Sequence, residues 1–191
     1  MLLIDEADYI LLNHALLIDH ENVVALSATS FTKDYVDETK FITSLNFKCI
    51  DSKISGAINW KTATTDCSDV EQFLQHSRNF AKIIYNTNPD FTFECTMKDC
   101  RDLSRLKALT SSDILLITKA ELARGIDYRV APNSDTEGIS LFVMSSAANL
   151  RAYVQLLGRV GRYKEECKRF KLSELKDPID RLAQARMLYA L

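Results

Sequence analysis

Short apolar runs that stop at polar or small residues set the pattern of this 191-residue chain. Four of them are continuous enough for strands buried on both faces of a parallel sheet, although a buried helix gives the same pattern. These runs cover residues 1–4, 23–26, 114–117 and 139–144. Residues 91–95 form a weaker strand candidate.

Helical patterns lie between the apolar runs. Ser68-Asp-Val-Glu71 has the form of a capping box, and an apolar stripe that begins there predicts a helix continuing to Ile84. Asn88-Pro89 supplies its stop. Leu103, Leu106 and Leu109 indicate a shorter helix, and Asp177-Pro178 the start of a terminal one. Because strands alternate with helices, we expect an α/β fold with a parallel sheet and flanking helices.

The most favourable domain boundary falls near residues 54–61, around Gly56. Residues 1–55 contain two convincing strands, which are too few for a complete nucleotide-binding lobe. Residues 56–170 contain at least three more strands with helices between them, and 171–191 are expected to form a C-terminal helix. The chain therefore reads as a partial first lobe joined to most of a second lobe.

Composition narrows the class of protein. The chain is 47% hydrophobic, enough for a core, but no apolar stretch approaches the roughly 20 residues that span a bilayer. Its five cysteines form no Cys-x-x-Cys pair, which favours reduced thiols and an intracellular location in cytoplasm or nucleus. The net charge of -2 argues against a uniformly basic surface, yet residues 151–171 carry seven bases against two acids. A solvated helical face explains that run equally well.

Polar residues follow the first two apolar runs, and in open α/β sheets functional groups gather at the carboxyl ends of strands. Asp5 can hold a magnesium ion that bridges terminal phosphates, and Glu6 can orient or deprotonate the attacking water. Ser27 and Thr29 can bond Asp8 and couple hydrolysis to lobe movement. The structural alternatives are an acidic helix start and a polar turn.

A third group follows residues 114–117. Thr118 comes directly after that run and can contact a nucleic-acid phosphate. Gly125 lets the backbone approach a ligand closely, and Asp127 can accept from a ribose hydroxyl. A loop glycine followed by a capping aspartate is the alternative, and we give the two interpretations similar weight.

Residues 155–162, Gln-Leu-Leu-Gly-Arg-Val-Gly-Arg, are the most specific element. On a helix, Gln155, Arg159 and Arg162 stand at i, i+4 and i+7 and share one face. Gly158 and Gly161 would each cost a helix about 1 kcal/mol relative to alanine, which indicates close backbone packing or an early helix end. Arginine suits the charge that develops on a transferred phosphate, so we favour a functional interpretation.

Taken in order, these segments resemble motifs II, III, V and VI of superfamily 2 helicases. The resemblance covers residues 1 to about 165 and implies two RecA-like lobes, with ATP and magnesium in the cleft and a nucleic-acid strand across both. By matching positions it assigns Asp5 and Glu6 to magnesium and water, Asp127 to the ribose, and Gln155, Arg159 and Arg162 to the γ-phosphate. Further candidate nucleic-acid contacts are Arg151, Lys164, Lys168 and Arg169.

The chain also departs from that family. It contains no Gly-Lys-Ser/Thr phosphate loop, and no clear motif IV strand is evident between Ser55 and Phe91. Gln155 replaces the usual histidine of DEAD-box proteins, which points toward the DExH side or toward protein-translocation ATPases. We therefore expect a portion of an ATP-dependent helicase or translocase, with the rest of the first lobe upstream or on another chain. The alternatives are a non-catalytic helicase-like scaffold or binding module, or a fragment of a protein-translocation-type ATPase.

Overall fold

The computed structural model describes residues 2–4, 23–26, 64–98, 108–119, 127–146, 150–161 and 166–175. The chain divides into two compact units, which are described separately below. One unit comprises Met1–Ser55 and Ile179–Leu191, and the other comprises Gly56–Pro178. The short helix expected around Leu103 and Leu106 and the terminal helix expected from Asp177 lie outside the described residues.

In the first unit, two of the expected strands form a parallel pair. Strand β1 (Leu2–Ile4) pairs with β2 (Val23–Ala25), with Leu3 opposite Val24. Leu3, Val24 and Leu26 share one face and are 60%, 42% and 48% exposed, whereas Ile4 is buried. The expectation that these strands are buried on both faces is therefore wrong for that face.

The second unit contains an all-parallel sheet, which confirms the predicted α/β class. Its described strands lie in the order β3-β8-β7-β4-β6-β5. Their bounds are β3 Thr64–Cys67, β4 Phe80–Tyr85, β5 Met97–Lys98, β6 Ile114–Ile117, β7 Gly138–Val143 and β8 Glu166–Leu172. The described helices are α3 (Val70–His76) and α4 (Leu150–Leu157), and neither has the length and apolarity to cross a bilayer.

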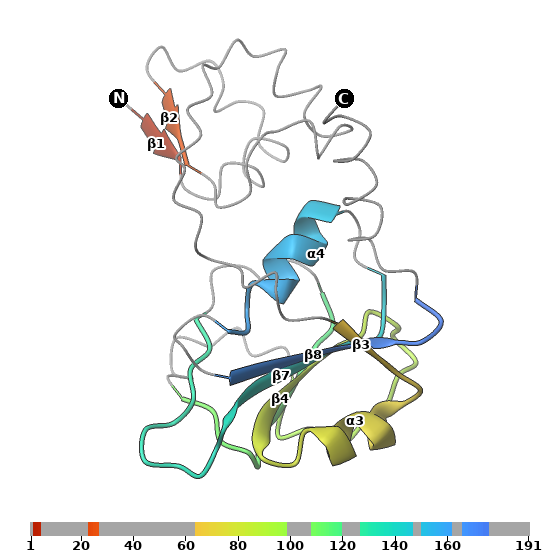
Figure 1. Ribbon diagram of the computed structural model, residues 1–191. Helices are drawn as coiled ribbons and strands as arrows, with labels where there is room; N and C mark the ends of the chain where they lie inside the picture. The colour runs from red at the N-terminus through yellow and green to blue at the C-terminus, as the bar shows by residue number, and fades with distance from the viewer. Residues whose placement is uncertain are drawn as a thin grey trace, which may run out of the picture. The chain divides into compact units, whose positions relative to one another are not determined.

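The two helices lie on opposite faces of the sheet (Figure 1). Phe73 of α3 stacks on Phe142 of β7 at 5.0 Å between ring centroids and meets Phe170 of β8 edge-on at 5.5 Å. These rings form the centre of a buried cluster with Cys67, Ile84 and Leu116. Alternate side chains of a strand point to opposite faces, so Arg169 of β8 points away from α3 and interacts with Tyr153 of α4.

Helix α3 begins one residue later than the predicted capping box. Asp69 is the N-cap and accepts from the Gln72 amide at 2.8 Å, while the Gln72 side chain accepts from the Ser68 amide at 2.7 Å. The helix ends at His76, so its expected continuation to Ile84 is wrong. Residues 80–85 form β4 instead, and every one of them is buried, as suits a central parallel strand.

Strand β4 also lies in the interval where the sequence showed no clear strand, and β8 was missed as well. A solvated helical face was one of two interpretations of the basic run ending at Lys171, and a C-terminal helix was expected from 171. Glu166–Leu172 is instead a strand between β3 and β7. Lys171 of this strand forms an ion pair with Asp66 of β3, with Nζ 2.6 Å from Oδ1. Residues 91–95 form no strand, and the edge strand begins at Met97.

Strand β4 places an amine in the interior. Lys82 is 7% exposed, and its Nζ donates to the Phe80 carbonyl at 2.9 Å and to the Ser111 carbonyl at 2.5 Å. Burial lowers the pKa of Lys82 below its ordinary value of 10.5, and Asp113 opposes that shift. The two hydrogen bonds to carbonyl oxygens therefore offset part of the free-energy cost of removing the ammonium from water.

We predict a pH-dependent difference in stability between the wild-type chain and Lys82→Met. Because the folded-state pKa of Lys82 is lowered, the unfolded chain binds more protons between that pKa and 10.5. The free energy of unfolding of the wild type should therefore rise relative to the variant as pH increases through that window. Urea unfolding of both chains from pH 7 to 10.5 measures this. The prediction is contradicted if the free energy of unfolding of the wild type minus that of Lys82→Met stays constant or falls over this range.

Candidate functional site

Two connections of the sheet start side by side, at the carboxyl ends of neighbouring parallel strands, and run in opposite directions. Strands β4 and β7 are neighbours, but the chain leaves β4 toward β5 on one side and leaves β7 toward β8 on the other. In open α/β sheets, ligands bind beyond the carboxyl ends of the strands at such a switch point. We call the residues found there, Asn86, Thr87, Asn88, Met144 and Ser145, the switch-point cluster.

Side-chain hydrogen bonds tie the two halves of this cluster together. The Ser145 hydroxyl donates to Asn86 Oδ1 at 2.9 Å and accepts from the Thr87 amide at 3.0 Å. Asn86 Oδ1 also accepts from the Asn88 amide at 2.9 Å, and Asn86 Nδ2 lies 3.8 Å from Met144 Sδ. Asn86 is only 6% exposed, so the cluster is built around a buried amide.

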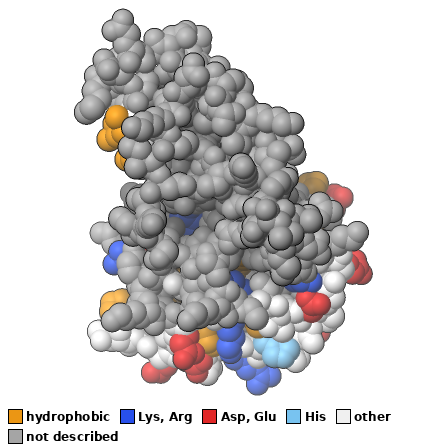
Figure 2. Space-filling model, turned by 45° about the horizontal axis from the view of Figure 1, so that its top comes forward, with side chains coloured by type: hydrophobic (Ala, Val, Ile, Leu, Met, Phe, Trp, Pro, Cys, Tyr) orange, Lys and Arg blue, Asp and Glu red, His pale blue; other side chains and the backbone are white. Residues whose placement is uncertain are grey.

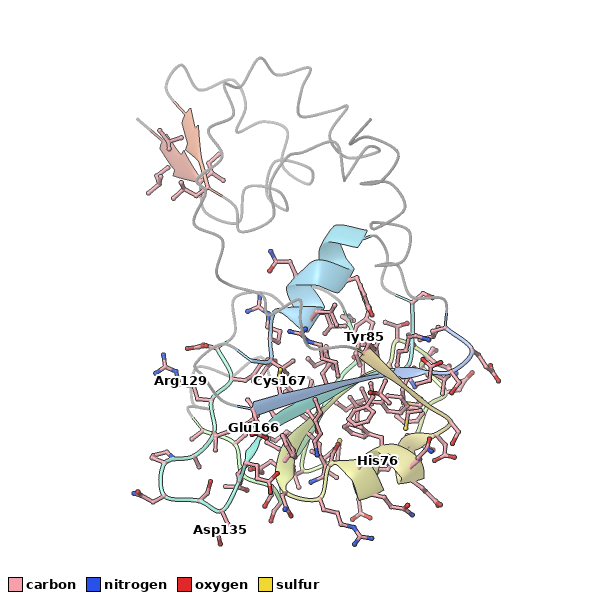
Figure 3. The ribbon with its side chains drawn as sticks, in the orientation of Figure 1. His76, Tyr85, Arg129, Asp135, Glu166 and Cys167 are labelled. Atoms are coloured by element: carbon pink, nitrogen blue, oxygen red, sulfur yellow. The ribbon has the colours of Figure 1, made fainter. Side chains whose placement is uncertain are left out.

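The backbone continues the sheet into the cluster. The Asn86 amide donates to the Ile117 carbonyl at 3.0 Å, and the Met144 amide donates to the Tyr85 carbonyl at 2.9 Å. Figure 3 shows Tyr85 on the side of the sheet that faces α4 and His76 on the side of α3. The sequence interpretation missed this site because Asn88-Pro89 was taken as a helix stop. A polar segment directly after the apolar run 83–85 was the signal that could have found it.

Two of the candidates around motif V are described. Thr118 follows β6 directly and is half-buried, beside the switch-point cluster in the strand order. Arg129 donates from Nε and Nη2 to Asp127 Oδ2 at 3.0 and 2.9 Å. The Leu109 amide donates to the Arg129 carbonyl at 2.7 Å and fixes the backbone there. Both side chains of the pair are partly exposed, and such pairs contribute little to stability. Gly125 lies outside the described residues.

The arginine segment follows α4 directly. The helix ends at Leu157, and the Arg159 amide donates to the Leu156 carbonyl at 3.0 Å in a tightened last turn. This confirms the early helix end that the glycines indicated. Arg159 Nη2 still reaches Gln155 Oε1 at 3.1 Å, and the two residues are 3% and 6% exposed. Arg162 lies outside the described residues.

Gly161 shapes the connection from α4 to β8. Its φ of 77° lies in the left-handed region, and a Cβ placed on it would lie 2.7 Å from Cys167 Sγ. Glycine is therefore required both for the backbone conformation and for the close approach to β8.

The two basic candidates on β8 differ in exposure, since Lys168 is exposed and Arg169 is buried. Lys168 Nζ donates to the His76 carbonyl at 3.2 Å and lies 4.2 Å from the centre of the Phe80 ring. Arg169 is 2% exposed, and burial lowers its pKa although Cys167 and Tyr153 oppose that shift. A side chain so buried does not fit the expected contact between Arg169 and nucleic acid. On the face in Figure 2, described acidic and basic side chains are interspersed.

The remaining candidates cannot be placed. Nothing is described of the Arg151 side chain, although its backbone belongs to α4. The other candidates outside the described residues are Asp5, Glu6, Asp8, Ser27, Thr29 and Lys164. Within the described part of the chain, no group of three or more His, Cys, Asp or Glu side chains is arranged to hold a metal. Burial also raises the pKa of the Cys67 thiol, which disfavours a reactive thiolate.

Comparison with known proteins assigns no family to this chain. No protein-family model matches the sequence, and no curated protein shows significant similarity to it.

We predict that Gly161→Ala destabilises the second unit and that Cys167→Ala partly rescues it. The added methyl group meets Cys167 Sγ, so truncating that side chain should remove the steric part and leave a left-handed backbone cost of about 1 kcal/mol. Thermal unfolding of the two single variants and the double variant measures this. Equal destabilisation by Gly161→Ala in both backgrounds would show that the contact with Cys167 is unimportant.

Proposed function

We propose that this chain is a portion of an ATP-dependent helicase or translocase that acts on nucleic acid, with a RecA-like second lobe. The observation that carries the proposal is the placement of the motif-like residues in an all-parallel sheet. Thr118 follows the carboxyl end of β6, and the Gln155–Arg159 pair stands between β7 and β8. Such placement is what a nucleotide- and strand-binding α/β lobe requires.

The buried pair at the end of α4 supports a role toward phosphate. Gln155 orients the Arg159 guanidinium through a neutral amide and so leaves its positive charge intact. Arginine stays charged even when buried, and its donor fork suits a developing phosphate charge. Arg159 is nearly as buried as Arg169, so this role requires a movement that exposes its guanidinium. Arg162 is proposed to act with this pair.

ATP and magnesium are the proposed cofactors. Asp5 is assigned to magnesium, Glu6 to the attacking water, and Asp127 to the ribose, with Gly125 allowing close approach of the backbone. Asp8 is proposed to couple hydrolysis to movement through Ser27 and Thr29.

The proposed nucleic-acid strand lies along the carboxyl ends of β4, β6 and β7. Thr118 and Thr87 carry short hydroxyls there, which suit backbone oxygens of any sequence. Arg151, Lys164 and the exposed Lys168 are proposed to supply the attraction to phosphates, since Arg169 is buried.

We predict that residues 1–191 alone hydrolyse ATP negligibly, because the sequence contains no Gly-Lys-Ser/Thr loop to cradle the β- and γ-phosphates. The measurement is phosphate release with magnesium, with and without single-stranded nucleic acid. Glu6→Gln is the matched variant. Turnover in the wild type that disappears in Glu6→Gln would contradict the prediction.

We predict salt-sensitive binding of single-stranded RNA or DNA. The logarithm of affinity should fall linearly with the logarithm of salt concentration, and Arg151→Glu with Lys164→Glu should reduce the slope by about 1.4, since each phosphate contact contributes about 0.7. Arg78→Glu, an exposed charge reversal at the other end of β4, is the control and should leave the slope unchanged.

Fluorescence anisotropy of labelled oligonucleotides, measured from about 50 to about 300 mM salt, gives the affinity and its salt dependence. Absence of binding by the wild-type chain would refute the proposed substrate and favour the non-catalytic scaffold or the protein-translocation alternative.

A further inference from the structure

We propose that Asn86 is the positioning residue of the switch-point cluster. Its side-chain amide fixes the loop after β4 to the connection after β7 and thereby orients Thr87 and Ser145. In the proposed function the Thr87 hydroxyl donates to the nucleic-acid backbone, so this part of the inference rests on the proposed function. The fixing of the two loops does not.

The orientation of the Asn86 amide follows from its neighbours. The Asn88 backbone N–H can only donate, so the amide atom 2.9 Å from it has to be the acceptor oxygen. A flipped amide would set two donors against each other at that position. The oxygen therefore faces Asn88 and Ser145, and the nitrogen faces Met144 Sδ, which is a weak acceptor.

One oxygen thus joins segments far apart in the chain. Asn86 Oδ1 accepts from Asn88 in its own loop and from Ser145, which lies 59 residues away after β7. The Ser145 hydroxyl accepts in turn from the Thr87 amide. Since each hydroxyl can donate only once, Ser145 uses its proton on Asn86 and its lone pair on Thr87, and the three residues hold one arrangement.

Burial gives this arrangement its rigidity. Asn86 is 6% exposed, whereas Thr87 is exposed and Ser145 is half-buried. A buried amide left without its partners costs more than an exposed one, so the bonds at Asn86 resist opening. The buried residue therefore holds the two more exposed residues, which are the ones that can reach a ligand.

The test uses amide hydrogen exchange of Asn86→Ala, Asn86→Asp and the wild-type chain. Asn86→Ala should increase the exchange of the Thr87 and Asn88 amides by about tenfold or more, the equivalent of losing about 1.4 kcal/mol. Asn86→Asp keeps an acceptor oxygen at the same place and should restore protection. Asn79→Ala is the matched control, because Asn79 precedes the same strand and donates to Glu137 on the exposed surface at 2.8 Å.

Single-stranded oligonucleotide binding by the same variants tests the substrate part. Asn86→Ala should weaken binding by about tenfold, and Asn79→Ala should leave it unchanged, with folding of each variant checked by circular dichroism. Unchanged exchange at Thr87 and Asn88 in Asn86→Ala would overturn the inference, and so would faster exchange with unchanged affinity. If the wild-type chain binds no oligonucleotide, the proposed function fails, and the exchange result alone decides whether Asn86 fixes the two loops.

Discussion

The insertion of β4 between β7 and β6 is the constraint on which the rest of this structure depends. All six residues of β4 are buried, so the strand needs cover on both faces and hydrogen-bonded neighbours on both edges. With β4 at the centre, the chain must leave it toward β5 while it leaves β7 toward β8. The switch point is therefore a consequence of where one apolar strand is buried. Lys82 is buried with the rest of the strand, and its ammonium donates to two backbone carbonyls.

Aromatic packing decides how the two faces are covered. Phe73 lies against Phe142 and Phe170, which joins α3 to β7 and β8 and closes one face. Alternation along β8 then turns Arg169 toward α4, where the helix ends early and Gly161 allows a close approach to Cys167. Arg159 follows this helix end and contacts Gln155.

The sequence predicted the α/β class and the strands whose apolar runs are bounded by polar residues, such as β6 and β7, because burial on both faces leaves a continuous signal. It assigned β4 to a helix, because a short apolar run that follows a capped helix fits the helical repeat as well as it fits a buried strand. It missed β8 because a strand next to the sheet edge carries charged side chains that satisfy one another, as Lys171 does with Asp66. The spacing of Gln155 and Arg159 predicted that they lie together, and their side chains are in contact, whereas the Asn86 contact depends on a partner 59 residues away.

Charge counting along the chain misjudges which groups can meet a ligand, and β8 shows why. Lys168 and Arg169 are neighbours in one basic run, yet they point to opposite faces: the first caps the carboxyl end of α3 and the second is buried beside α4. Of the two, Lys168 is exposed and Arg169 is not. Under the proposed function, a phosphate backbone at the carboxyl ends of the strands would meet the exposed Thr87 hydroxyl, whose loop Asn86 holds in place. Attraction by charge and positioning of the strand would then come from different elements, and the second could be altered without changing net charge.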